Sequence, residues 1–233
     1  MVPKSVNVDQ AIAWFACGWK IFAQNPGTWV VLGVILLAID VVLWHIPFIG
    51  SFALALLGPL LIAGLLYGAT ELQAGRPLEL GHLFHAFQDG RHRIPLLLLG
   101  VVAVVSAVVC GLILLGFMGG ALAGMMAGDP SATIAVGTGA AIAALLVLAI
   151  LSAVSMALFY AVPLVVLGDV PAGAAMQSSI RACVQNFLSL LVFSVIYTVL
   201  AIVATLPLGL GWLVLLPWSI GMLYCSYQDI YGT

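Results

Sequence analysis

The chain contains six apolar runs that are each long enough to cross a lipid bilayer, and this feature leaves few folds open to it. About 20 residues of helix suffice to span the hydrocarbon core. The runs lie at roughly 28–46, 48–70, 94–127, 132–167, 187–206 and 208–228. Because backbone groups in lipid must be hydrogen-bonded within a helix or a closed barrel, and these runs lack barrel alternation, each predicts a helix. We expect an all-α membrane protein with six transmembrane helices in three hairpins.

Composition supports this class and excludes others. Of 233 residues, 64% are hydrophobic and only 6% are charged, too few charges to cover the surface of a soluble globule. The net charge of −2 gives no clustered basic surface, so no nucleic-acid partner is expected. The four cysteines, Cys17, Cys110, Cys183 and Cys225, form no CxxC pair. Neither a disulfide nor a zinc site is therefore expected.

The basic residues predict how the chain lies in its membrane. All six fall in the N-terminal segment or between hairpins, and none falls at a hairpin tip: Lys4, Lys20, Arg76, Arg91, Arg93 and Arg181. Cytoplasmic loops of membrane proteins carry an excess of Lys and Arg, so both termini are expected in the cytoplasm. We expect no cleavable signal peptide at the N-terminus, and we expect the first span to direct insertion.

Each hairpin is preceded by an amphipathic stretch that we expect to lie on the cytoplasmic face of the membrane. At 78–91 the residues Leu80, Leu83, Phe84 and Phe87 share one helical face, typical of an interfacial helix. The stretch at 9–24 has an apolar stripe that includes Ile12, Phe15, Ala16, Trp19, Phe22 and Ala23, while Trp14 and Ile21 lie on its other side. A third such helix is expected over 172–186, with Asp169 and Pro171 at its start.

The same features recur in order, which predicts one membrane domain, 1–233, built from repeat units at about 9–72, 78–168 and 171–230. The first unit contains Lys20, Gln24-Asn25, Pro47, Pro59 and Tyr67, and the third contains Arg181, Gln185-Asn186, Pro207, Pro217 and Tyr224. A unit with two spans returns to its starting side, so such repeats would be parallel and related by an axis along the membrane normal.

The middle hairpin is longer than a bilayer requires and contains regularly spaced small residues. Residues 94–127 would form a helix of roughly 50 Å, and its distal half has Gly116, Gly120, Gly124 and Gly128 at four-residue intervals, with Met118, Met125 and Met126 beside them. Small residues let helix backbones approach closely. Either the two helices of this hairpin pack on each other, or the Gly/Met-rich face binds another subunit.

Few ionisable residues are candidates for a site. Asp40 is an acid within a span, where such groups are costly and often functional, although its place in the outer third also permits a structural role. His82 and His85, with Glu79 and Asp89, could hold a metal, but one helix rarely completes such a site. We interpret them as a solvated face and expect no metal.

Aromatic and basic residues beside the spans predict contact with membrane lipids. At these positions aromatic rings and cations lie at headgroup depth. The residues are Trp19, Lys20, Phe84, Phe87, Arg91, Arg93 and Arg181.

The sequence lacks a G-x-S-x-G elbow, H-E-x-x-H, a P-loop and a dinucleotide fingerprint. We therefore expect no catalytic residue and no cofactor. The leading hypothesis is a non-enzymatic component that binds a membrane-protein partner, or a second copy of itself, through the Gly/Met-rich hairpin. The alternative is a small transporter, channel or lipid-handling protein with Asp40 as its intramembrane polar element.

Nearly the whole chain resembles a bacterial family of six-span inner-membrane proteins of unknown function. The resemblance rests on Gly18-Trp19 with Asn25-Pro26, Ile46-Pro47 with Gly50, Leu83-Phe84 with Phe87, Ser179 to Asn186, Pro207 with Gly209, and Tyr224-Tyr227-Asp229. The segment leading into Ser178-Ser179 is also similar to membrane regions that accompany some glycerophosphodiester phosphodiesterases, outside their catalytic domain. These likenesses imply a bacterial inner-membrane module with interfacial helices and give no information about its activity.

Overall fold

The computed structural model describes residues 2–47, 49–126 and 132–232, and the regular elements in these ranges are all helical. In chain order they are α1 (Val8–Gln24), α2 (Pro26–Trp44), α3 (Ile49–Gln73), the 3-10 helix η1 (Leu80–Phe84), α4 (His85–Gln88), α5 (Arg93–Met126), α6 (Ala132–Phe159), α7 (Ala161–Gly168), α8 (Ala172–Gln185), α9 (Phe187–Thr205) and α10 (Trp212–Tyr231). The predicted all-α class is confirmed.

Five helical stretches are long and apolar enough to cross a membrane, which places the chain among membrane proteins. They are α2, α3, α5, the stretch from Gly137 to Gly168 that covers α6 and α7, and α9. The sixth apolar run forms α10, but polar residues such as Gln228 and Asp229 lower its hydropathy towards the C-terminus. Much of α10 is buried in protein, with Tyr227 and Ile230 at 1% and 0% exposure.

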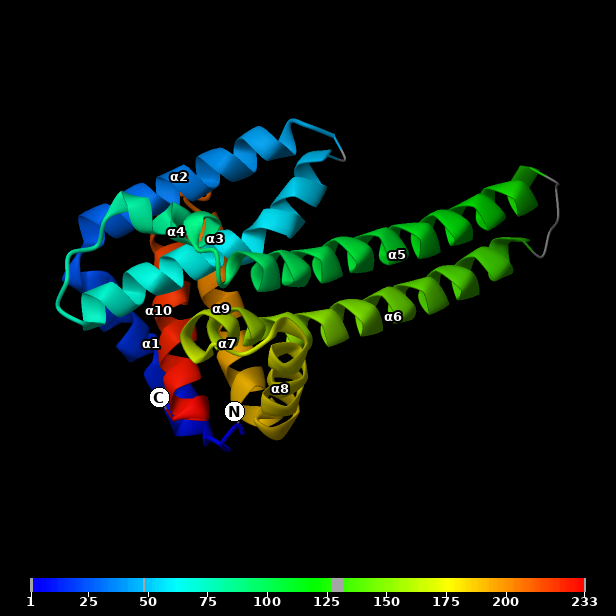
Figure 1. Ribbon diagram of the computed structural model, residues 1–233. Helices are drawn as coiled ribbons and strands as arrows, with labels where there is room; N and C mark the ends of the chain where they lie inside the picture. The colour runs from blue at the N-terminus through cyan, green and yellow to red at the C-terminus, as the bar shows by residue number, and fades with distance from the viewer. Residues whose placement is uncertain (1, 48, 127–131, 233) are drawn as a thin grey trace.

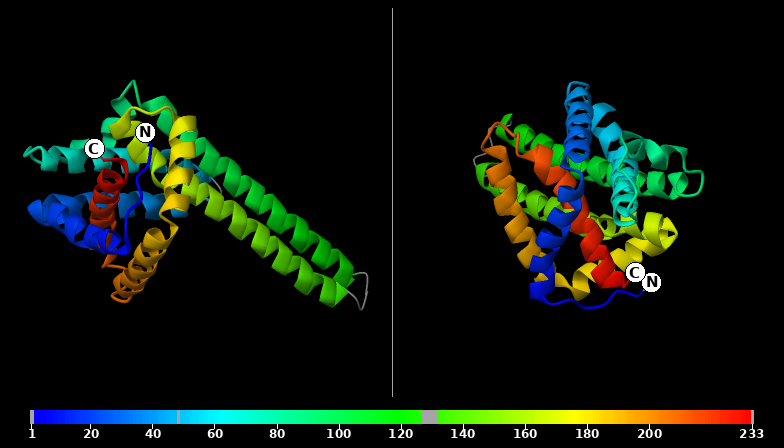
Figure 2. Two further views of the ribbon diagram at one scale, coloured as in Figure 1. Left: turned by 90° about the horizontal axis from the view of Figure 1, so that it is seen from below. Right: turned by 90° about the vertical axis from the view of Figure 1, so that its left-hand side faces the viewer.

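The helices form three hairpins, α2/α3, α5/α6 and α9/α10, which diverge from a common base (Figures 1 and 2). Both chain ends lie in this base, where the backbone N–H of Lys4 donates to the carbonyl of Ile230 at 2.7 Å. The buried side chain of Asn186 holds the N-terminal segment there. It donates to the carbonyl of Lys4 at 3.0 Å and accepts from the N–H of Val6 at 2.7 Å.

An asparagine lies at each of two junctions between an amphipathic helix and the long helix that follows it. Asn25 ends α1, and its side chain accepts a hydrogen bond from the N–H of Thr28 at 3.3 Å, which caps α2. Pro26 follows at the first position of α2, where proline costs no hydrogen bond. Asn186 lies between α8 and α9, but its side chain hydrogen-bonds to Lys4 and Val6 of the N-terminal segment and does not cap α9.

The base is held together by three contacts in which a short helix packs on a long one. α1 crosses α10 where Gly18 meets Gly221 and Met222. η1 lies against α3 so closely that a Cβ on Gly64 would overlap the carbonyl oxygen of Leu83. α8 packs on α6 and α7 through Ser179, whose hydroxyl donates to the carbonyl of Met156 at 2.6 Å and accepts from the N–H of Tyr160 at 3.0 Å.

Two of the predicted interfacial helices differ from expectation. The buried face of α1 contains Trp14, Gly18 and Ile21, whereas Ile12 and Trp19 of the predicted stripe are about half exposed. The stretch at 78–91 is not one helix but η1 followed by the single turn α4. The backbone of this stretch packs on α3 at Gly64. Apolar periodicity within the stretch gives no information about that contact.

A disulfide joins Cys17 of α1 to Cys225 of α10. The expectation that no disulfide forms was therefore wrong. The two cysteines are 208 residues apart in sequence, and only the crossing of α1 and α10 brings them together. Cys110 and Cys183 are free and buried.

Candidate functional site

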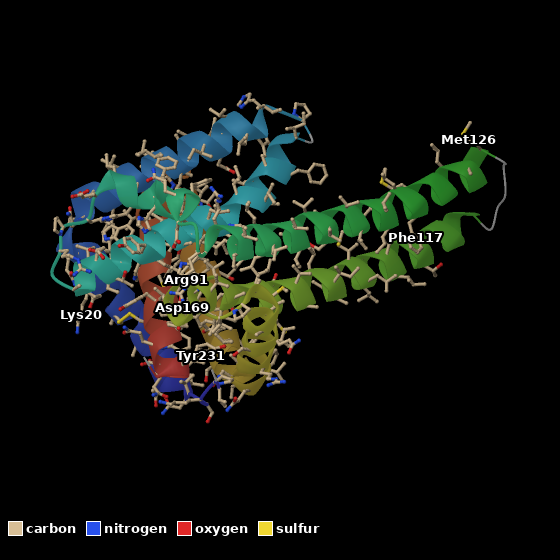
Figure 3. All side chains as sticks on the ribbon, in the orientation of Figure 1. Lys20, Arg91, Phe117, Met126, Asp169 and Tyr231 are labelled. Atoms are coloured by element: carbon tan, nitrogen blue, oxygen red, sulfur yellow. A yellow bond between two sulfur atoms is a disulfide. The ribbon has the colours of Figure 1, made fainter. Side chains whose placement is uncertain are left out.

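The α5/α6 hairpin extends well beyond the base, with Phe117 and Met126 towards its far end (Figure 3). α5 is a single helix of 34 residues, or about 51 Å at the usual rise per residue. The helix of the returning arm breaks at Tyr160, between α6 and α7, close to the base. The break therefore lies at the opposite end of the hairpin from the Gly/Met-rich segment.

Three glycines of the distal half of α5 are uncovered. A Cβ added at Gly116, Gly119 or Gly120 would meet no described atom within 4 Å. Across the hairpin, a Cβ on Gly139 of α6 would lie 3.1 Å from the ring of Phe117. The two helices thus pack together through Phe117 and Gly139, and this packing does not use Gly116 or Gly120.

The neighbours of these glycines extend the exposed apolar surface. Met118 and Met126 are 69% and 81% exposed, and Leu122 is 60% exposed. Gly124 is half-buried. Gly128 and the side chain of Met125 lie outside the described residues. At about 100° per residue, Met118 and Leu122 lie on the side of α5 opposite to Gly116 and Gly120. We call the surface along Gly116 and Gly120 the distal face of α5.

A second group of side chains lies at the base, where His92 bridges two carboxylates. Its Nδ1 lies 2.6 Å from an oxygen of Asp89, and its Nε2 lies 2.7 Å from an oxygen of Asp169. Arg91 adds an ion pair to Asp169 at 3.3 Å (Figure 3). Asp169 ends α7 in the left-handed conformation with φ 53°, which turns the chain back towards α8. The bridge therefore connects the N-terminal end of α5 to the α7–α8 connection.

The bridge favours the charged forms of His92 and Asp89. Burial alone would lower the pKa of His92, but its hydrogen bonds to Asp89 and Asp169 outweigh burial and raise that pKa above the usual 6.5. For Asp89, burial opposes the charged form, while hydrogen bonds from His92 and from backbone N–H groups prevail and lower its pKa below 3.8. His92 and Asp89 are thus held as an ion pair over a wide range of pH.

Tyr67 of α3 organises the two histidines that the sequence offered as metal ligands. The ring of His85 stacks on it with centroids 4.0 Å apart, and His82 meets its edge at 5.6 Å. Tyr67, His85, Asp89 and His92 also line a cavity of about 70 Å³. In the described part of the chain no three His, Cys, Asp or Glu residues are placed to hold a metal ion.

Asp40 lies near the end of α2 and is exposed. Neither the cavity beside His92 nor the larger cavity between α6 and α9 has Asp40 in its lining. One turn further on, the Nδ1 of His45 lies 2.7 Å from the carbonyl oxygen of Val41.

The predicted lipid-contacting residues separate into two groups. Trp19, Lys20, Phe84, Arg93 and Arg181 are exposed. Arg91 is also exposed but is engaged with Asp169, and Phe87 is half-buried beside Phe84. Trp19 packs edge-on against Trp218 of α10 with centroids 5.4 Å apart, so aromatic side chains gather where α1 meets α10.

Sequence reasoning missed the bridge because its residues belong to different elements. The neighbours of His92, Arg91 and Arg93, indicate contact with lipid, and Asp169 indicates the start of a helix, so neither pattern points to a contact between His92 and Asp169. A histidine flanked by Asp89 three residues earlier was a weak local signal, but the contact to Asp169 spans 77 residues and has no pattern in the sequence.

No family model, curated protein or solved structure matches this chain. Its function is therefore inferred below from its own residues.

Proposed function

We propose that the protein is a non-enzymatic assembly component of a membrane, which binds another transmembrane helix through the distal face of α5. The observation that carries this proposal is the uncovered glycine pair Gly116 and Gly120 on a helix whose own partner packs elsewhere. Association in lipid depends on close backbone approach, which small residues permit and large ones prevent. A partner helix laid along this face would meet no obstructing side chain at the two glycines.

The length of α5 supports the same proposal. At about 51 Å the helix exceeds the hydrocarbon core, which is about 30 Å thick. With its base near one surface of the membrane, its tip would extend beyond the other surface, and exposed side chains such as Met118 and Met126 would then need cover from protein. A second copy of this hairpin, or a partner membrane protein with more than one helix, would provide it.

We further infer that α10 completes a set of six spans and that the chain is a threefold parallel repeat. In each proposed unit a short helix packs on the second long helix of another unit: α1 on α10, η1 and α4 on α3, and α8 on α6 and α7. The same relation thus occurs three times, and the contact of α1 with α10 closes the ring. Asn25 and Asn186 hold equivalent positions in the first and third units.

For the orientation we retain the positive-inside argument, which puts the base and both termini in the cytoplasm. The bacterial inner membrane is the location that the family resemblance implies. Contact with membrane lipids is proposed through Trp19, Lys20, Phe84, Arg93 and Arg181, which are exposed near the base. The alternative function in transport gains no support from Asp40, which lines neither described cavity.

The experiment is a pair of glycine substitutions read out as complex size. Because a Cβ at Gly116 or Gly120 meets no described atom, the Gly116→Leu/Gly120→Leu variant should fold and insert normally. We expect it to lose its complex in a native gel of membranes solubilised in mild detergent. Gly58→Leu in α3, where a Cβ also meets no described atom, is the matched control and should keep the complex. A complex of unchanged size in the double variant would refute the proposal.

A further inference from the structure

A cavity of about 190 Å³ lies between α6, α8 and α9, separate from the distal face of α5. Its walls are mostly apolar, with Phe159 of α6 facing Phe187 and Leu191 of α9. The polar groups in its lining are the hydroxyls of Ser155 and Ser194 and the thiol of Cys183. Cys183 is only 5% exposed, and its thiol lies 3.6 Å from the carbonyl oxygen of Met156.

The cavity occupies a place where the other two hairpins have a helix contact. The eighth residue of α2 is Gly33, and a Cβ there would lie 3.0 Å from the carbonyl oxygen of Leu213 in α10. The eighth residue of α5 is Gly100, and a Cβ there would overlap the carbonyl oxygen of Leu56 in α3. In these two hairpins the first helix thus touches the second helix of another hairpin, backbone to backbone, at a glycine.

The eighth residue of α9 is Ser194, which lines the cavity instead of closing it. The backbone contact that glycine makes in α2 and α5 is thus not repeated by Ser194, and α9 stands away from α6. α9 packs instead against α1, where the ring of Phe193 lies 4.9 Å from that of Phe15 and Ser189 donates to the carbonyl of Val6. The divergence of α9 from α6 therefore leaves a lateral opening between two helices that can span a membrane.

The size and surroundings of the cavity decide what can occupy it. A helix with its side chains is about 10–12 Å across and is too wide for this space. An apolar cavity of about 150 Å³ holds a molecule the size of benzene, so 190 Å³ accommodates a segment of hydrocarbon chain. Because the flanking helices lie in lipid, the hydrocarbon at hand is an acyl chain of the bilayer. We propose that this cavity is a specific site for one acyl chain of a membrane phospholipid.

The test uses purified protein in vesicles of phosphatidylethanolamine and phosphatidylglycerol that contain a phospholipid with a photoreactive group on its acyl chain. After illumination, labelled peptides are mapped by mass spectrometry. We expect labelling at Phe159 and Phe187 roughly tenfold above that on the exposed face of α2 at Val34 and Val41, a preference of about 1.4 kcal/mol. Equal labelling of both surfaces would mean ordinary bilayer contact and would overturn the proposal.

Two variants make the result specific to the cavity. Ser194→Phe places a ring in the cavity and should lower labelling at Phe159 by roughly tenfold. Thr198→Phe, one turn further along α9 and exposed, is the matched control and should leave labelling unchanged. If Ser194→Phe does not fold, Leu191→Trp fills the same space. Undiminished labelling in a folded, cavity-filled variant contradicts the site, as do protein cross-links from Phe159 or Phe187 to another helix.

Discussion

Gly18 of α1 and Gly221 of α10 meet backbone to backbone, since a Cβ on Gly221 would stand only 2.8 Å from the carbonyl oxygen of Gly18. The contact joins the first helix of the chain to the last. Two further contacts reinforce it on the side towards the N-terminus of α1: the disulfide Cys17–Cys225, and the indole N–H of Trp14, which donates to Asp229 at 2.8 Å.

This crossing predicts that Gly221→Leu destabilises the protein. The added side chain must displace the backbone of α1, and overpacking of this kind costs about 1–3 kcal/mol. Thermal unfolding in detergent should show a lower midpoint for Gly221→Leu than for the wild type. Gly58→Leu, at an open position of α3, controls for the general effect of leucine. Equal midpoints for the two variants would show that α1 can leave α10 without cost.

The sequence was sufficient for the elements that depend on long apolar runs and on local chemistry. The bounds of α2, α5 and α9 fall within a few residues of those predicted, because hydrophobic length and residues such as Pro26 act locally. η1 was mispredicted as part of a longer helix because its conformation depends on Gly64, a residue of another element.

The candidate sites also divide into those formed by residues of one helix and those formed by residues of distant elements. The distal face of α5 could be proposed from the sequence because its glycines repeat every four residues on one helix. The bridge of His92 with Asp169, the disulfide of Cys17 with Cys225 and the cavity at Ser194 could not, because each joins segments far apart in the chain. Periodicity reports which face of a helix is apolar and contains no information about the helix that it meets.

The bridge at His92 predicts a pH-dependent stability. The pKa of His92 in the folded protein is raised above 6.5. The stabilisation that protonated His92 provides is therefore complete below its pKa in the unfolded chain and is lost as the pH rises through its folded pKa. Asp89 has a folded pKa below 3.8, so its contribution to stability is lost as the pH falls through that pKa. His92→Gln should lower stability by about 1 kcal/mol at pH 6, discounted because Asp169 is half exposed.

Thermal midpoints of the wild type and His92→Gln, measured from pH 5 to 9, test this prediction. The difference between the two proteins should be largest at the acidic end and should shrink as the pH rises. His85→Gln is the control, since His85 stacks on Tyr67 and makes no ion pair in the described part of the chain. A difference that grows with pH would mean that His92 is neutral in the bridge.

The disulfide reports on which side of the membrane the base lies. Reducing conditions in the cytosol keep such cysteine pairs in the thiol form. With the base in the cytoplasm, as the basic residues predict, we expect Cys17 and Cys225 to be thiols in living cells and to join after exposure to air. Cells quenched in acid and then denatured and alkylated with a polymer-tagged maleimide should show four labelled cysteines, and air-treated membranes two. Cys17→Ser should give three in both cases. Two labelled cysteines in quenched wild-type cells would place the base on the oxidising side.

Asp40 is exposed on α2, near the end of a span, and an exposed carboxylate there faces lipid or its interface. Insertion of a charged acid at the centre of a span costs about 2.5–3.5 kcal/mol and costs less towards the end. Asp40→Leu should therefore make insertion of α2 more favourable by about 1–2 kcal/mol, measured as the inserted fraction in a glycosylation-mapping assay. Thr28→Leu, at the other end of α2, controls for added hydrophobicity.

Because no described cavity contains Asp40, the Asp40→Leu variant should also keep its thermal midpoint. A loss of folding or of insertion would show instead that the carboxylate has a partner, and would return Asp40 to the centre of the transport hypothesis.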